Sequence, residues 1–562
     1  MRNNDAIRRF VAVAVVLFVS RSAKANNNAA STAAPPPTVA SVGLQPAEKP
    51  ISDVVDDYIG QRLAAAKLTP APQADDANLL RRITLDLAGR VPTPWEVQEF
   101  LSSKDPGRLE QTVDRLIGSE AFIDHQVNEF DWLLMEGKGN LRPYLAEAFR
   151  ERRGWDRMFR ELILAEGAAA AEKNITAKHA VEFLKPRMKD HDRLTNDVSS
   201  LFFGVNISCA QCHDHPLAKD WKQDHFYGLK SFLGRTFENG GYVGERDYGL
   251  VTYLTPAGEQ RKAKLMFLTG FTVKEPQRDE PDNKAKKAEQ EILKTLADKK
   301  QAPPKPSYSR RQMLVDTALS KTQRDFFARS IVNRIWARLF GHGLVMPVDQ
   351  MHSANPPSHP ELLAWLARDT AEHDFDLSRL IRGLVLSKAY GRDSRWTAGE
   401  RPAPEFFAVG QVRPLSPHQY AASLRIATAD PELWGKLPDE TTRMQRANSL
   451  AASSRGWAAS FAPLTDNFQV GVGESLLLTN DARIASEFLS DAGDRLVGRM
   501  KQLKTPAEQA SVGVSTVLGR SAHVDELKLL TDYLTDRKSR PLDAARQVVW
   551  SLLTSSEFRF NY

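Results

Sequence analysis

The residues best suited to chemistry are the only two cysteines of the 562-residue chain and the histidine that follows them. Cys209, Cys212 and His213 have the spacing Cys-x-x-Cys-His, by which haem is attached covalently to c-type cytochromes. On a helical turn these three side chains share one face, and Pro216 ends the turn by disfavouring helical geometry in the residue before it. The pattern predicts haem c bonded to both thiols, with His213 as an axial iron ligand.

Two other interpretations of these residues stay open. In the first, Cys209 and Cys212 bind zinc or another metal together with one or two of His213, His215 and His225. The absence of further cysteines counts against it, since structural zinc sites usually take a second ligand pair from elsewhere in the chain. In the second, the cysteines form a small disulfide or remain a thiol pair that only packs.

If haem binds, the sixth iron position decides the activity. A methionine or histidine there favours electron transfer, whereas an open position binds a small molecule or peroxide. The candidates for this ligand are His215, His359, Met351 and Met188, with His191 and His352 as further possibilities. His359 stands at a predicted helix start, where the dipole disfavours protonation and leaves a lone pair for a metal. The alternative role of His359 is that of a solvent-facing residue in the first turn.

The beginning of the chain has the features of a secretory signal peptide. Arginines precede an apolar run over residues 10–19, which is too short to span a bilayer, and Ala23-Lys24-Ala25 resembles a cleavage site. The sequence therefore predicts a signal peptide over residues 1–25 and an exported protein, periplasmic or at the cell surface. Bacteria attach haem c outside the cytoplasmic membrane, so this prediction agrees with the haem motif.

Composition bears on the class of partner. Hydrophobic residues make up 42% and charged residues 26% of the chain, which is ordinary for a globular protein. The net charge of +6 is interleaved with acids, so we expect no nucleic-acid partner and leave open a redox or protein partner. No later segment is apolar for long enough to form a transmembrane helix.

Hydrophobic periodicity and capping signals predict a mainly α fold of two helical domains, with a small β hairpin or sheet and a charged linker between them. Four Ser/Thr residues precede Glu or Gln at capping-box spacing, namely Thr93, Ser358, Ser416 and Thr505. The arginines and acids of the first domain are expected on solvated helix faces. The predicted divisions are a disordered tether (26–50), a cytochrome-like helical domain (51–236), a β element and charged linker (237–306), and a C-terminal helical domain (307–562).

Several longer motifs resemble a known pair of domains. Residues 79–89 (LLRRITLDLAG) and 209–216 (CAQCHDHP) belong to the first domain; residues 327–336, 340–345 (FGHGLV), 355–363 (NPPSHPELL), 413–416 and 552–558 belong to the second. The chain thus resembles the planctomycete-type domains of unknown function, a cytochrome-like domain of the fifteen-forty-nine series followed by its companion of the fifteen-fifty-three series. His225 and His342 stand where the resemblance leads us to expect other residues, so neither is expected as a shared ligand.

The resemblance implies little about function beyond the motif itself. We expect an exported protein with one c-type haem and an electron-transfer or other redox role. The alternative is an exported zinc- or disulfide-containing helical protein that binds a surface or hydrolyses a substrate without haem.

Overall fold

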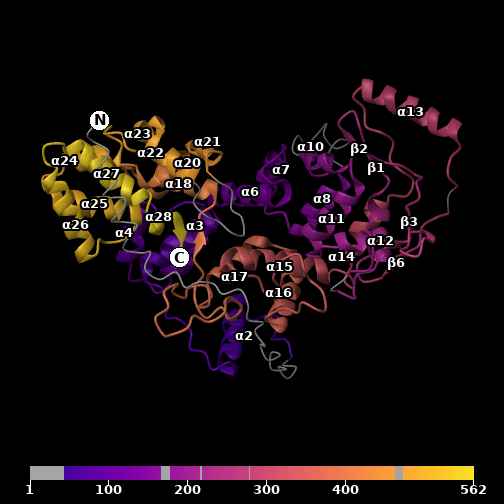
Figure 1. The fold of residues 1–562 in the computed structure, drawn as a ribbon, viewed down its shortest axis with the longest axis horizontal. Helices are drawn as coiled ribbons and strands as arrows, with labels where there is room; N and C mark the ends of the chain where they lie inside the picture. Colours follow the sequence, from indigo (N-terminus) through magenta and orange to yellow (C-terminus); the bar gives the residue numbers. More distant parts are fainter. Residues whose placement is uncertain (1–42, 166–176, 216–217, 278, 462–471) are drawn as a thin grey trace. The chain divides into compact units, whose positions relative to one another are not determined.

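The computed structural model confirms the mainly α fold class (Figure 1). The predicted signal peptide and most of the predicted tether lie outside the described residues, whereas residues 44–562 form one compact unit. No described helix is both long and apolar enough to cross a membrane. The described residues are 43–165, 177–215, 218–277, 279–461 and 472–562.

Helices occupy most of the first part of the chain. Asp75 and Gly89 bound α3 (Asp76–Ala88): the Asp75 carboxylate accepts from the backbone N–H of Asn78, and Gly89 ends the helix with φ +66°. These helices are α2 (Ile51–Ala65), α3 (Asp76–Ala88), α4 (Pro94–Ser102), α5 (Arg108–Ile117), α6 (Glu120–Met135), α7 (Arg142–Arg150), α8 (Trp155–Leu164), α10 (Ala177–Ala180), η1 (Val181–Phe183), η2 (Lys185–Arg187), α11 (His191–Phe203), η3 (Ser208–Gln211) and α12 (Gln223–Leu233).

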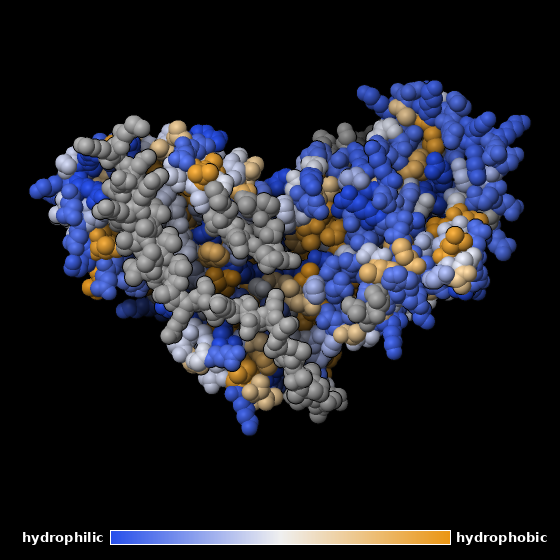
Figure 2. Space-filling model, in the orientation of Figure 1, coloured by the Kyte–Doolittle hydropathy of each residue, from blue (hydrophilic) through white to orange (hydrophobic). Residues whose placement is uncertain are grey.

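Short antiparallel hairpins and one polar helix follow. The strands are β1 (Thr236–Asn239), β2 (Tyr242–Glu245), β3 (Thr252–Leu254), β4 (Gln260–Lys262), β5 (Leu265–Met266) and β6 (Thr272–Val273). Strand β3 pairs with β4 and strand β5 with β6, each in an antiparallel pair. The helix is α13 (Asn283–Asp298), which lies within the predicted charged linker, and its surface is largely hydrophilic (Figure 2).

The remaining chain is again helical. Its elements are α14 (Arg310–Leu319), α15 (Asp325–Phe340), α16 (Pro360–Glu372), α17 (Leu377–Val385), η4 (Pro404–Phe406), β7 (Arg413–Pro414), α18 (Pro417–Ala427), α19 (Leu433–Lys436), α20 (Glu440–Ser453), α21 (Arg455–Ala458), α22 (Val472–Asn480), α23 (Ala482–Glu487), α24 (Leu496–Gln502), α25 (Pro506–Leu518), α26 (Val524–Asp536), α27 (Pro541–Leu553), α28 (Ser556–Arg559) and β8 (Phe560–Asn561).

The capping boxes at Thr93, Ser416 and Thr505 are confirmed. The one predicted at Ser358 is wrong, because Pro360 takes the first helical position and His359 becomes the N-cap. The Ser358 hydroxyl instead lies 3.1 Å from the His359 ring.

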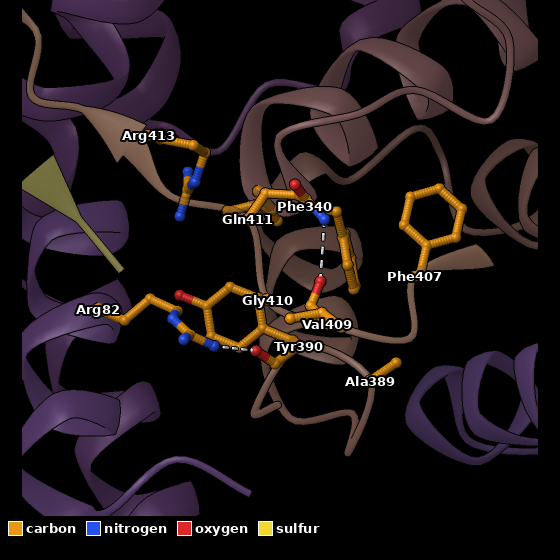
Figure 3. Close-up of a pocket in the computed structure, with 10 residues that line it drawn as sticks. Arg82, Phe340, Ala389, Tyr390, Phe407, Val409, Gly410, Gln411 and Arg413 are labelled. Atoms are coloured by element: carbon orange, nitrogen blue, oxygen red, sulfur yellow. Dashed lines mark hydrogen bonds between the residues drawn. The ribbon is translucent and has the colours of Figure 1, made fainter. Parts of the chain in front are cut away.

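Arg81, Arg82 and Asp86 of α3 are buried, so their predicted position on a solvated helix face is wrong, whereas Asp76 at the start of the helix is exposed as predicted. Arg81 donates to the carbonyl of Phe558, and Arg82 donates to those of Arg392 and Tyr562. Figure 3 shows Arg82 also reaching the Tyr390 carbonyl, in a small pocket where Arg413 lies nearby. Carbonyls at residues 390–392 and 558–562 supply the acceptors that solvent would otherwise provide, and these long-range contacts are invisible to local periodicity.

Asp86 completes this buried cluster. It accepts two hydrogen bonds from Arg413, at 2.7 and 3.0 Å, and one each from Tyr390 and Asn561. The motif at 79–89 therefore fastens α3 to the chain after α17 and to β7 and β8.

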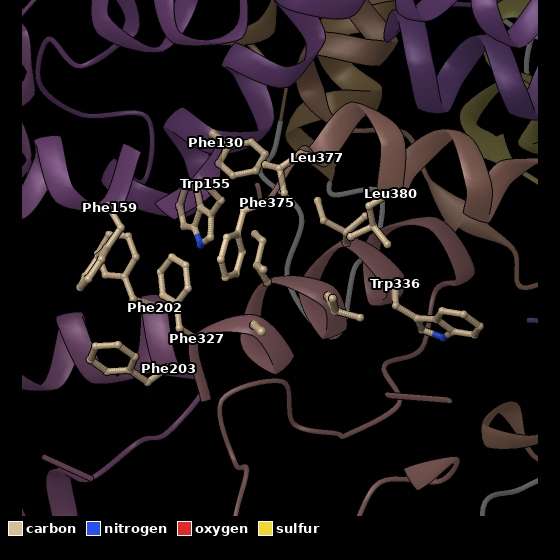
Figure 4. Close-up of a cluster of buried hydrophobic side chains, with 14 of the residues drawn as sticks. Phe130, Trp155, Phe159, Phe202, Phe203, Phe327, Trp336, Phe375, Leu377 and Leu380 are labelled. Carbon is tan, nitrogen blue, oxygen red and sulfur yellow. The ribbon is translucent and has the colours of Figure 1, made fainter. Parts of the chain in front are cut away.

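The described residues of the compact unit form two hydrophobic cores. The first runs through residues 51–409 and includes both parts of the chain that flank the hairpins. Phe327 of α15 packs 5.0 Å from Phe159 of α8 and 6.4 Å from Trp155, measured between ring centroids (Figure 4). The second core is formed by residues 415–558 together with Leu85 and Val91. The aromatic cluster thus joins α8 and α11 directly to α15.

Candidate functional site

The Cys-x-x-Cys-His motif begins on a short 3-10 turn, η3. One side of this turn is buried in the protein, and the other side is exposed. Ile207 and Ala210 are fully buried, whereas Cys209 and Cys212 are exposed and carry free thiols. The Asn206 side chain caps the start of the turn by accepting from the backbone N–H and the hydroxyl of Ser208. The predicted helical turn is present only as the 3-10 turn Ser208–Gln211, which ends before Cys212 and His213 rather than near Pro216.

His213 follows the turn with an exposed ring whose Nδ1 lies 2.7 Å from the carbonyl oxygen of Asp214. Because a carbonyl only accepts, Nδ1 carries the hydrogen in this contact, and the Nε2 atom keeps its lone pair. Metal-binding histidines commonly use such a backbone carbonyl to fix ring orientation and tautomer. The Asp214 carboxylate in turn accepts from the backbone N–H of Gln223.

Helix α12 holds the end of the turn. The Gln223 amide donates to the carbonyls of Gln211 and Cys212, at 3.3 and 3.1 Å. The Tyr227 hydroxyl donates to the Gln211 carbonyl, and its ring stacks on Tyr253 with centroids 4.1 Å apart. These contacts determine where the backbone around Cys212 lies.

The aromatic residues that follow the motif, Trp221, Phe226, Tyr227 and Phe232, mostly belong to the core. Phe226 and Phe232 are fully buried and Trp221 is 3% exposed. Tyr227 alone among them is half-buried and reaches the motif.

His215 turns towards the other part of the chain. Its backbone N–H donates to the Trp221 carbonyl, and its Nδ1 accepts from the backbone N–H of Ala218 at 3.0 Å. Its ring centroid lies 6.1 Å from that of His352. Burial lowers the pKa of His215, and the neighbouring His352 and His213 lower it further. His213 and His352 therefore lie close enough to His215 to affect its charge.

The loop over residues 344–358 brings His352 to this position. The backbone of this loop is hydrogen-bonded to the segment before the motif. The Asn206 N–H donates to the backbone carbonyl of Asp349, and the Met351 N–H donates to the backbone carbonyl of Gly204. Ser353 donates through its backbone N–H and its hydroxyl to the Asp220 carboxylate, at 3.0 and 2.6 Å. The loop is thus tied to both flanks of the motif.

The other predicted candidates for the axial iron ligand each lie in a different environment. Met188 and Met351 are 7% and 6% exposed, and Met351 packs against Gly204. His191 lies 2.9 Å through Nε2 from the Thr236 carbonyl. His359 is 4% exposed beside Phe407, and burial lowers its pKa to about 3. It is the N-cap of α16 and is buried, which differs from the predicted alternative of a solvent-facing residue.

The described residues also bear on a metal site. Across the described ranges, no group of three or more His, Cys, Asp or Glu side chains is arranged to hold a metal ion. The His225 Nδ1 accepts from the Lys222 backbone N–H, and this contact forms the start of α12.

Sequence reasoning missed two features of this region. The contact of the 344–358 loop with the motif joins segments more than a hundred residues apart, and no local signal marks it. The His352 Nδ1 atom is buried and has no hydrogen-bond partner among the described residues. The sequence signal in this loop is the close spacing of Pro356, Pro357 and Pro360, each of which fixes its own φ angle.

Comparison with known families defines the class to which this fold and site belong. The PSCyt2 model, described as a protein of unknown function (DUF1549), matches residues 54–238, and the PSD1 model, a protein of unknown function (DUF1553), matches residues 310–456. The chain therefore belongs to the proteins that carry these two domains in this order, which confirms the predicted pair. The motif lies in the first and His352 in the second. No curated protein and no solved structure matches the chain.

Proposed function

We propose that this is an exported c-type cytochrome-like protein with one haem, joined by thioether bonds to Cys209 and Cys212, and with a redox role. The observation that carries the proposal is the exposed turn with two free thiols followed by His213, whose Nδ1 faces a carbonyl. Attachment needs both thiols accessible to the porphyrin vinyl groups, and an axial histidine needs a free ring nitrogen.

The residues of the chain have distinct roles in this proposal. Cys209 and Cys212 hold the macrocycle, and Asp214 keeps the His213 ring in the tautomer whose Nε2 can ligate iron. Gln223 and Tyr227 restrain the backbone that carries them. When bound, the haem supplies a one-electron couple whose potential depends on the axial ligands and on the burial of the site.

Export supports the same proposal. Covalent attachment takes place outside the cytoplasmic membrane of bacteria, and residues 1–25 have the pattern of a signal peptide. Free thiols in that compartment are also substrates for disulfide formation, so the attachment must compete with oxidation.

The test is production of the full chain in a bacterium with the c-type haem attachment machinery. The proposal predicts a peroxidase-active haem band that survives a denaturing gel, and its loss in the Cys209→Ser/Cys212→Ser double variant. His213→Ala should alter the absorption spectrum, while His373→Ala, an exposed histidine of another region, should not. A colourless product containing one equivalent of zinc would contradict the proposal and favour the metal alternative.

A further inference from the structure

One face of α6 carries a row of side chains that have no role in the proposed function. Asp124, Asn128 and Trp132 are four residues apart, so they lie one above the other on this face and form what we call the α6 strip. The helix lies between α20 and α7 (Figure 1). The strip is about 12 Å long, from the rise of an α-helix. One of its ends is an exposed indole, and the other lines a polar cavity.

The indole of Trp132 is open to solvent. It is 51% exposed, although tryptophan side chains are mostly buried in folded proteins. Gly137, with φ +70°, lies against the six-membered ring, because a Cβ atom added to this glycine would be 3.6 Å from it. The glycine therefore supports one side of the ring, and the exposed side can stack on the apolar face of a ligand.

The cavity lies beside the other end of the strip. It has a volume of about 40 Å³ and is lined by Asp124 and Asn128 together with His125, His418 and Asn448. This volume holds roughly two or three water molecules, so it accepts the hydroxyl groups of a ligand but not a ring.

The cavity offers hydrogen-bond donors as well as acceptors. Burial lowers the pKa of His418 and the Arg142 charge lowers it further, so the ring is neutral at pH 7 and has one donor and one acceptor nitrogen. The Asn128 side-chain oxygen accepts from Arg142 at 2.7 Å, and its NH₂ group remains a donor. A hydroxyl group, which both donates and accepts, can pair with each of these side chains.

The charged groups near the strip are paired. Asp124 lies 2.7 Å from Arg455, and these side chains are 45% and 52% exposed. Arg142 lies 3.4 Å from the Asp131 carboxylate. Since each charge has an opposite partner, the strip does not favour a ligand of either sign.

An exposed indole next to neutral donors and acceptors matches the chemistry of a sugar. A pyranose has a face of C–H groups that stacks on an aromatic ring, and a rim of hydroxyl groups. We propose that the α6 strip binds a neutral oligosaccharide, with one pyranose ring on Trp132 and hydroxyl groups of a neighbouring unit at Asn128 and His418. The strip, at about 12 Å, is longer than one pyranose ring, so at least two linked units fill it. The Cys-x-x-Cys-His motif is not part of the strip, so this inference does not depend on haem attachment.

The experiment is isothermal titration calorimetry of the full chain with cellotriose, laminaritriose, maltotriose, xylotriose and mannotriose. We expect at least one of these neutral trisaccharides to bind. Its monosaccharide should bind at least about 10-fold more weakly, because one unit cannot reach both ends of the strip. Adenosine is the aromatic alternative, and trigalacturonic acid is the charged one. Protein produced without the haem attachment machinery should give the same affinities, which separates this test from that of the proposed function.

Four variants locate the site. Trp132→Ala should weaken binding by about 10-fold or more, whereas Trp132→Phe, which keeps a ring, should stay within about threefold. Asn128→Ala should weaken binding by about 5- to 10-fold, which corresponds to one hydrogen bond of ordinary strength. Phe271→Ala is the matched control, because it removes an aromatic ring that is 48% exposed in another region, and it should change nothing.

The inference is overturned if no neutral trisaccharide binds at millimolar concentration, or if adenosine or trigalacturonic acid binds more tightly than all of them. It is also overturned if a folded Trp132→Ala protein binds as tightly as the wild type. The melting temperature of each variant shows whether it is folded. Should Trp132→Ala fail to fold, unchanged binding by Asn128→Ala would contradict the assignment to this strip.

Discussion

Replacing Glu96 by glutamine should remove one of the largest local contributions to stability. The Glu96 carboxylate is 1% exposed and pairs with the fully buried Arg90 through two hydrogen bonds of 2.8 and 2.9 Å. It also accepts from the Thr93 backbone N–H at 2.7 Å, in the capping box of α4. Glu96→Gln leaves the Arg90 guanidinium buried without a counter-charge.

The magnitude follows from the pKa of Glu96. Burial by itself would raise this pKa, but the charge and hydrogen bonds of Arg90 outweigh burial and lower it from 4.5 to about 2. A shift of this size corresponds to about 3 kcal/mol of stability, on the scale of about 1.4 kcal/mol for each pKa unit. The folded-state pKa is depressed, so the contribution is present above pH 4.5 and is lost as pH falls towards 2.

The assay is urea unfolding followed by far-UV circular dichroism at pH 7 and pH 3.5. The free energy of unfolding of the wild-type protein should exceed that of Glu96→Gln by about 3 kcal/mol at pH 7. This difference should be about 1.4 kcal/mol smaller at pH 3.5. Glu508→Gln is the matched control, because Glu508 occupies the same capping-box position of α25 but is exposed and has no buried arginine. The reasoning fails if Glu96→Gln unfolds at the same urea concentration as the wild type. It also fails if Glu96→Gln and Glu508→Gln lower the free energy of unfolding equally.

Three further changes test other parts of the structure. Asp86→Asn should cost about 3 kcal/mol in urea unfolding, because it leaves the partly buried Arg413, whose side chain is 18% exposed, without its carboxylate partner. Burial, reinforced by the Arg338 charge, lowers the pKa of His125 to about 3, so the neutral ring stabilises the fold above pH 6.5. The free energy of unfolding should decrease by about 1.4 kcal/mol for each pH unit as the pH falls from 6.5 to about 3. The His125→Leu variant should lack this slope. Gly383→Ala should lower the melting temperature, at a cost of about 1–3 kcal/mol, because the new Cβ would lie 2.5 Å from the Ile51 Cβ atom. An unchanged melting temperature would show that α2 and α17 pack less closely than the structure indicates.

Local signals in the sequence predicted individual elements well. Asp75 and Gly89 mark the ends of α3, and Thr505 with Glu508 marks the start of α25. Each signal is a hydrogen bond or a backbone conformation within a few residues, so it needs no knowledge of the rest of the fold. The Ser358 prediction failed for an equally local reason, since the proline at 360 shifts the first helical residue.

The tertiary environment could not be predicted in the same way. Arg81 and Arg82 look like surface residues because their acceptors are carbonyls more than three hundred residues away in the chain. Likewise, β3 finds its partner in the exposed, charged segment 260–262, which lacks any hydrophobic alternation. Pairing there depends on backbone hydrogen bonds across a turn rather than on side-chain pattern.

The candidate site contains both a feature that the sequence predicts and features that it does not. A helical turn beginning at the motif was expected from the spacing of Cys209 and Cys212, but neither its end at Gln211 nor the position of His352 beside His215 was. It depends on the 344–358 loop, whose contacts with residues 204–206 and 220 arise only in the folded chain.

The most direct test of the haem proposal is the intact mass of the mature protein, denatured after production with the attachment machinery. The proposal predicts a mass increased by one haem, retained in acid and organic solvent because two thioether bonds at Cys209 and Cys212 hold it. Loss of the increase in the double serine variant would confirm the attachment points. A mass equal to the bare polypeptide, or one lower by two hydrogens, which indicates a disulfide between the two cysteines, would contradict it.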